Sequence, residues 1–125
     1  MQHWVTKFRN AIVGLGLGVQ GQTSFYVHVP IAIIVIIAAC LLQCSWWQTC
    51  TLLICIGAVL SLELMNSALE SMARGLSPDH NPHVGNSLDM ASAAVLVMSI
   101  CAAIVGIIIL GGRAIELLTV AGAIS

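Results

Sequence analysis

Four polar residues recur at regular intervals inside a strongly apolar stretch near the middle of the chain. Their spacing of i, i+3, i+4 and i+7 places them on one face of an α-helix: Glu63, Asn66, Ser67 and Glu70. Charged side chains at membrane depth cost about 2.5–3.5 kcal/mol on insertion scales and are therefore candidates for function. Because lipid cannot satisfy these groups, we expect this polar stripe to face a partner helix or a polar cleft.

The chemistry open to the stripe depends on how deep its members lie. At 1.5 Å per residue, Glu63 lies about 21 Å along its predicted helix, and Glu70 lies about 10 Å beyond it, close to the membrane surface. The next apolar stretch begins at that surface with Asp89, followed one turn later by Ser92. We expect four residues to converge where a membrane substrate meets a water-soluble one: Glu63, Asn66, Glu70 and Asp89. Hard oxygen ligands at this place suit Mg²⁺, which bridges to nucleotide phosphates.

A simpler interpretation of the stripe stays open. Asn and Ser often join membrane helices through hydrogen bonds, so helix packing explains Asn66 and Ser67 as well as chemistry does. Two carboxylates suit that purpose poorly, which favours a functional role for Glu63 and Glu70. We interpret His28 as an interfacial hydrogen-bonding residue, and His80 and His83 as solvated loop residues. The five cysteines lie in apolar stretches and are interpreted as small buried side chains.

The composition indicates whether the chain lies in a membrane or in water. Of the 125 residues, 59% are hydrophobic and 7% are charged, whereas soluble domains have about 25% charged residues. Mean hydropathy is +1.04. These values exclude a soluble enzyme, a disordered chain and a nucleic-acid-binding protein. The chain is expected to be an integral membrane protein.

The sequence predicts an all-α fold with a single membrane domain over residues 1–125. Stretches of about 20 apolar residues, enough for a hydrocarbon core of about 30 Å, predict three transmembrane helices. An amphipathic pattern before them predicts a helix on the membrane surface, whose glycines permit close packing against a spanning helix. Turn-forming residues predict one loop. The predicted elements are a surface helix at 1–21, spans at 27–47, 49–73 and 89–110, and a loop at 74–87.

The few basic residues predict the orientation. Lys7, Arg9 and Arg74 fall on one side of the membrane, and Arg113 falls on the other. The positive-inside rule therefore places the N-terminus and the loop at 74–87 in the cytoplasm.

Two motifs together resemble the prokaryotic diacylglycerol kinase/undecaprenol kinase family. They are Glu63-x-x-Asn66-Ser67-Ala68-x-Glu70 and Asp89-x-x-Ser92-Ala93-Ala94-Val95-Leu96. Supporting matches are Phe8-Arg9, Phe25-x-x-His28 and Asp79-His80, and the resemblance covers about residues 7–112.

The resemblance implies a bacterial inner-membrane enzyme that transfers a phosphoryl group from MgATP to a lipid hydroxyl. Diacylglycerol, which would give phosphatidic acid, is favoured over undecaprenol as the acceptor. The family resemblance also implies a homotrimer with active sites shared between subunits, and no nucleic-acid partner.

The same resemblance assigns roles to individual residues. Glu63 would be the general base beside the lipid hydroxyl, and Ser92 would lie next to the lipid. Glu70 would bind the metal. The nucleotide site would include Arg9, Asn66, Glu70 and Asp89.

Two positions depart from the family pattern. Gln22 stands where the family commonly has a metal-binding Glu, and Leu88 stands where it commonly has Lys. Gln22 offers the metal only a neutral carbonyl, and Leu88 offers a phosphate no charge. These departures keep open a non-catalytic membrane protein that retains lipid or nucleotide binding. A small ion or proton channel is a third hypothesis, which the apolar outer half of each span disfavours.

Overall fold

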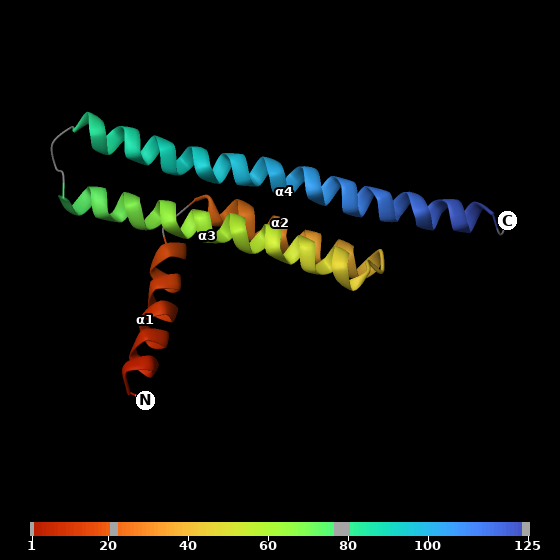
Figure 1. Cartoon of the computed structure of the whole chain (residues 1–125), viewed down its shortest axis with the longest axis horizontal. Helices are drawn as coiled ribbons and strands as arrows, with labels where there is room; N and C mark the ends of the chain where they lie inside the picture. Colours follow the sequence, from red (N-terminus) through yellow and green to blue (C-terminus); the bar gives the residue numbers. More distant parts are fainter. Residues whose placement is uncertain (1, 21–22, 77–80, 124–125) are drawn as a thin grey trace.

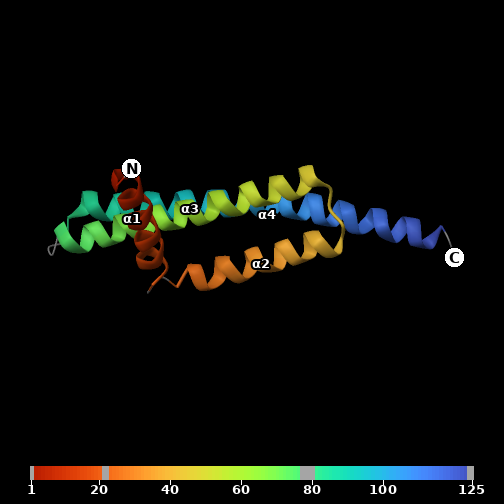
Figure 2. The ribbon, with the colours of Figure 1, turned by 90° about the horizontal axis from the view of Figure 1, so that it is seen from below.

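Four helices follow one another in the computed structural model, which describes residues 2–20, 23–76 and 81–123. They are α1 (Gln2–Val19), α2 (Phe25–Leu41), α3 (Trp46–Leu76) and α4 (Pro82–Gly122). Helices α3 and α4 lie antiparallel side by side, α2 packs along α3, and α1 leaves the bundle at a steep angle (Figure 1). A second view shows the same arrangement, with the C-terminal part of α4 running past the turn between α2 and α3 (Figure 2). The described residues contain no strand, which agrees with the all-α prediction.

Apolar side chains cover the outside of the bundle. Two of the described helices, α3 and α4, are long and apolar enough to cross a membrane, whereas α2 is also apolar but has 17 residues. Only 6% of the most apolar window of α4 is buried within the chain. The core helix of a soluble protein would be mostly buried, so the surface of α4 requires lipid or another subunit around it. These features are those of a helical membrane protein.

The tight turn between α2 and α3 contains two helix caps. After α2, Gln43 adopts the left-handed conformation with φ of 51°. The amide of Gln43 donates to the Cys40 carbonyl, and that of Cys44 donates to the Ala39 carbonyl, which together form a Schellman motif. Before α3, the Ser45 amide donates to Gln48 Oε1 at 2.8 Å, and the Gln48 amide donates to Ser45 Oγ at 3.4 Å. This reciprocal pair is a capping box, so α2 and α3 are held antiparallel.

The loop after α3 is shorter than the sequence predicted. Helix α3 continues to Leu76 and α4 begins at Pro82, so much of the predicted loop at 74–87 is helical. The Asn81 side chain accepts a hydrogen bond from the His83 amide at 3.0 Å, and Pro82 occupies the first turn, where its missing N–H costs nothing. Residues that the sequence analysis took for turn formers therefore start α4, seven residues before the predicted span at 89–110.

Helix α4 also ends later than predicted, at Gly122 rather than near residue 110. Arg113 joins it to the end of α2, because its Nε donates to the Leu42 carbonyl oxygen at 3.1 Å. Its guanidinium also pairs with Glu116 at 2.8 Å. No charged residue lies between Asp89 and Arg113, a rise of about 36 Å that exceeds the hydrocarbon core of about 30 Å. Both ends of α4 therefore have the length to reach beyond the hydrocarbon.

Helix α1 meets the bundle at its last turn. A Cβ atom added at Gly18 would collide with the side chain of Leu64 on α3. The absence of a side chain at Gly18 thus allows α1 to approach α3 next to the polar stripe. The close packing expected from the glycines of this segment is present at this residue.

The left-handed residue at the α2–α3 turn supports a stability prediction. Glycine enters this conformation without the steric cost of a Cβ atom. After allowance for its greater freedom in the unfolded chain, Gln43→Gly is expected to stabilise the protein by about 0.5–1 kcal/mol. Reversible unfolding in mixed micelles, followed by circular dichroism, measures the change. Gln48→Ala, which removes the capping box, is the opposite control. A lower stability for Gln43→Gly would contradict the turn described here.

Candidate functional site

The polar stripe of α3 faces the interior of the bundle. Glu63, Asn66 and Ser67 retain 4%, 7% and 4% of their accessible surface. Glu70, nearer the loop, is 31% exposed at its side chain. The stripe therefore faces α2 and α4, as its spacing predicted, and its exposure increases from Glu63 towards Glu70.

His28 on α2 meets the most deeply placed carboxylate. Its Nε2 lies 3.1 Å from Glu63 Oε1, and the two side chains are 22% and 5% exposed. Phe25, one turn earlier on α2, is 5% exposed, which anchors this end of α2 in the bundle. The sequence analysis expected His28 to form hydrogen bonds but did not identify Glu63 as its partner. The sequence feature that could have indicated this contact is Phe25-x-x-His28, which matches the family pattern and lies at the start of an apolar segment.

Asn66 connects Glu70 to α4. Its Nδ2 donates to Glu70 Oε1 at 3.0 Å, and its Oδ1 accepts a long hydrogen bond of 3.5 Å from Ser92 Oγ. Arg74 lies 4.0 Å from Glu70 Oε2, a distance at which an exposed ion pair contributes little. Asn66 thus orients the Glu70 carboxylate and sets the register between α3 and α4.

Ser67 has a different role from its neighbours in the stripe. Its hydroxyl donates to the backbone carbonyl of Glu63, one turn earlier, at 2.9 Å. This bond satisfies the hydroxyl within its own helix, as is common for Ser in apolar helices. The Ser67 hydroxyl therefore does not join two helices, as the simpler interpretation expected, but bonds within α3.

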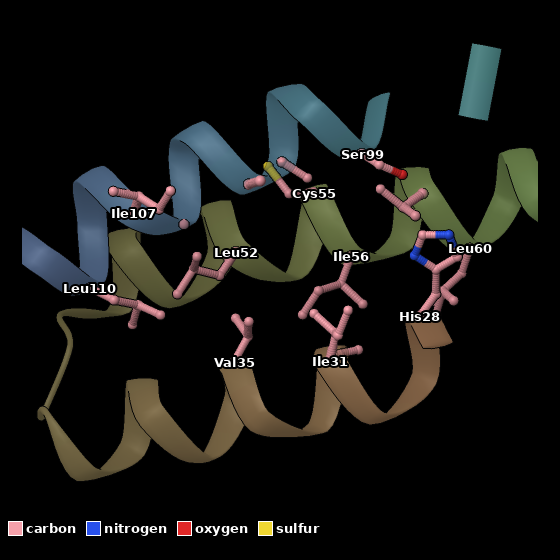
Figure 3. A pocket seen from close by; sticks show the side chains of 15 residues that line it. His28, Ile31, Val35, Leu52, Cys55, Ile56, Leu60, Ser99, Ile107 and Leu110 are labelled. Atoms are coloured by element: carbon pink, nitrogen blue, oxygen red, sulfur yellow. The ribbon is translucent and has the colours of Figure 1, made fainter. Parts of the chain in front are cut away.

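A polar pocket of about 260 Å³ opens beside these groups. It adjoins an apolar cavity of about 450 Å³ between α2, α3 and α4 (Figure 3). His28 and Ser99 line both spaces, so they mark the junction. The polar pocket is lined by Ser24, His28, Glu63, Asn66, Ser92, Val95, Leu96 and Ser99.

Of the four residues predicted to converge, one chain brings Glu63, Asn66 and Glu70 onto one helix face but leaves Asp89 apart. The Ser92–Asn66 contact sets the level of the two antiparallel helices, and one turn towards the loop from it lie Asp89 and Glu70. Asp89 is exposed and forms no hydrogen bond or ion pair with the described residues. Arg9 is exposed on α1, about 14 Å along that helix from Gly18. Neither residue therefore joins the buried polar stripe within one chain.

Of the two positions that the resemblance links to the metal, Glu70 and Gln22, only Glu70 lies within the described residues. Gln22 lies outside the described residues. Within residues 2–20, 23–76 and 81–123, no group of three or more His, Cys, Asp or Glu side chains is placed to hold a metal. Mg²⁺ commonly binds through one or two carboxylates together with water and substrate phosphates. A partly exposed Glu70 whose orientation is fixed by Asn66 fits that mode.

Comparison with known proteins decides the family. The family described as prokaryotic diacylglycerol kinase matches residues 9–110, a range that includes the whole stripe and Asp89. The chain belongs to the prokaryotic diacylglycerol kinase family. An undecaprenol kinase from Bacillus subtilis (strain 168) is 28% identical over 109 residues, which cover 84% of this chain and 89% of that relative. No solved structure matches the chain significantly. Membership of the diacylglycerol kinase family indicates a membrane lipid kinase.

The contrast between Asn66 and Ser67 can be tested. Asn66→Ala removes a hydrogen bond to a carboxylate, worth about 1.5–3 kcal/mol, so kinase activity is expected to fall about 10- to 150-fold. Ser67→Ala removes only a bond to its own helix backbone and should stay within about threefold of the unaltered protein. Initial rates of lipid phosphorylation in mixed micelles make the comparison. Equal losses in the two variants would show that both residues serve packing alone.

Proposed function

We propose that this protein transfers the γ-phosphoryl group of ATP to the hydroxyl of a membrane lipid, with Mg²⁺, at the cytoplasmic surface of the bacterial inner membrane. The carrying observation is that one helix presents a buried carboxylate beside an apolar cavity and a second, water-accessible carboxylate two turns away. The two substrates differ in the same way, because the lipid is dissolved in the membrane and the nucleotide is dissolved in water. The stripe therefore offers each substrate a carboxylate in the environment that suits it.

Glu63 is proposed as the general base. Glu63 lines the polar pocket. The adjoining cavity is lined mostly by aliphatic side chains. A lipid whose chain occupies apolar surroundings would bring its hydroxyl to this level. Glu63 would then take the hydroxyl proton as the oxygen attacks the γ-phosphorus, while Ser92, from the same pocket, lies beside the lipid.

Glu70 is proposed to hold Mg²⁺ on the nucleotide side. It lies about 10 Å along α3 from Glu63, which separates the metal carboxylate from the base. When bound, Mg²⁺ would neutralise charge on the phosphates. Asn66 orients Glu70 through its 3.0 Å hydrogen bond. Phosphoryl transfer depends mainly on such positioning and charge neutralisation.

A homotrimer would supply the surroundings that one chain lacks. Asp89 and Arg9 are exposed, and α4 leaves most of its apolar surface uncovered. In a trimer with shared sites, Asp89 would face the nucleotide at the level of Glu70. Arg9, on the cytoplasmic surface helix, would reach the phosphates of a site on a neighbouring subunit.

Two lipids remain candidates for the acceptor. Diacylglycerol is the acceptor that the sequence analysis favoured. Undecaprenol is the second candidate, because the Bacillus relative is an undecaprenol kinase. Both carry a primary hydroxyl on a long apolar body and would present it to Glu63 in the same way.

The decisive assay supplies labelled ATP, Mg²⁺ and one lipid at a time to the purified protein. Label is expected in diacylglycerol or undecaprenol, and Glu63→Gln should lower the rate by about 10²–10⁴-fold, the usual effect of losing a general base. Ser67→Ala is the matched control on the same helix face. If neither lipid is labelled above the Glu63→Gln background, the kinase proposal is wrong.

A binding protein without turnover is the second candidate function. It is favoured by Leu88, an apolar side chain next to Asp89 where the family commonly has a lysine. Nucleotide binding without phosphorylation of either lipid would support it.

A single substitution tests what Leu88 changes. A lysine ammonium close to a phosphate provides a charge-assisted contact of about 1.5–3 kcal/mol. Leu88→Lys is therefore expected to lower the KM for ATP about tenfold or more, with little change in the KM for lipid. Leu88→Gln controls for polarity without charge. An unchanged KM for ATP in Leu88→Lys would place residue 88 away from the nucleotide.

A further inference from the structure

The Glu63 carboxylate has one ion-pair partner among the described residues. That partner is His28, through Nε2 and Oε1 at 3.1 Å. The backbone carbonyl of Glu63 accepts from Ser67, but this bond leaves the carboxylate itself unrestrained. A side chain only 5% exposed has little water to replace a lost partner. The orientation of this carboxylate therefore depends on His28.

The contact determines which oxygen of Glu63 is available. Nε2 is the imidazole nitrogen that faces Oε1, at 3.1 Å, so a proton on Nε2 would be directed at a carboxylate oxygen, which accepts hydrogen bonds. Oε2 makes no hydrogen bond with the described residues. The second oxygen of the carboxylate is thus left for another donor in the polar pocket.

His28 also stands at the junction of the two spaces. Figure 3 shows its ring at one end of the apolar cavity, at the same end as Ser99 on α4. Ser99 Oγ is buried there without a hydrogen-bonding partner among the described residues. The polar or titratable groups that line the pocket around His28 are Ser24 just before α2, Glu63 and Asn66 from α3, and Ser92 and Ser99 from α4. Glu63 is the one acidic side chain among them.

We propose that His28 is a positioning residue of the lipid-kinase reaction, which holds Glu63 by Oε1 and keeps Oε2 directed at the incoming lipid hydroxyl. This inference rests on the proposed function and assigns it a residue on α2. His28 acts through Glu63 and does not take part in the proton transfer itself. Its removal should therefore slow the chemical step and leave nucleotide binding unchanged.

Three variants separate positioning from packing. His28→Ala removes both the ring and the donor, whereas His28→Gln keeps an N–H donor on a side chain of similar reach. His28→Ala is expected to lower kcat about 10- to 100-fold with the KM for ATP within about twofold, the pattern of a contact that matters in the transition state. His28→Gln should recover most of this loss. His83→Ala, which changes an exposed histidine at the start of α4, is the control expected to retain full activity.

Combination with Glu63→Gln shows whether His28 acts through Glu63. If it does, His28→Ala causes no further loss in the Glu63→Gln background, because coupled residues are not additive. The proposal is overturned if the two losses multiply, if His28→Ala keeps the unaltered kcat, or if His28→Gln is no better than His28→Ala. Failure of the proposed function is recognised separately, since the unaltered protein would then phosphorylate neither diacylglycerol nor undecaprenol.

Discussion

A carboxylate inside an apolar helix bundle needs a polar partner, and in this protein the contact between Glu63 and His28 provides it. The contact joins α2 to α3 at the depth where the polar pocket meets the apolar cavity. Without it, Glu63 would lose the one ion-pair partner that it has among the described residues, in a place where little water can take over. The capped turn between α2 and α3 holds the two helices antiparallel, in the arrangement in which His28 meets Glu63.

From this contact towards the loop, the polar side chains of α3 become more exposed to solvent. Glu63 is buried, Asn66 reaches across to α4, and Glu70 is partly exposed to water. A single helix face thus spans the change from lipid to aqueous surroundings within two turns. That gradient suits the proposed function, in which one substrate is dissolved in the membrane and the other in water.

Much of this was readable in the sequence. The helical spacing of the stripe predicted its burial, and the apolar composition predicted an all-α membrane fold, because lipid forces backbone polar groups into helices. The start of α4 was misjudged, since Asn81 and Pro82 are as typical of a helix N-terminus as of a turn. The capping box at Ser45 and Gln48 has a recognisable spacing that the analysis did not use.

Other parts of the site could not be read from spacing alone. The pairing of His28 with Glu63 depends on how α2 packs against α3, and no periodicity within one segment encodes that. The convergence predicted for Asp89 is incomplete in one chain because its side chain points outward. Glu63 is buried and Asp89 is exposed, so the two carboxylates do not meet within one chain.

The most direct test of this account is nuclear magnetic resonance of the imidazole nitrogens in ¹⁵N-histidine-labelled protein in lipid nanodiscs. The account predicts a His28 Nε2 resonance of a protonated, hydrogen-bonded nitrogen. This resonance should move in Glu63→Gln, while those of the exposed His3 and His83 stay in place. A His28 resonance that does not respond to Glu63→Gln would contradict the central contact, and with it the arrangement proposed for catalysis.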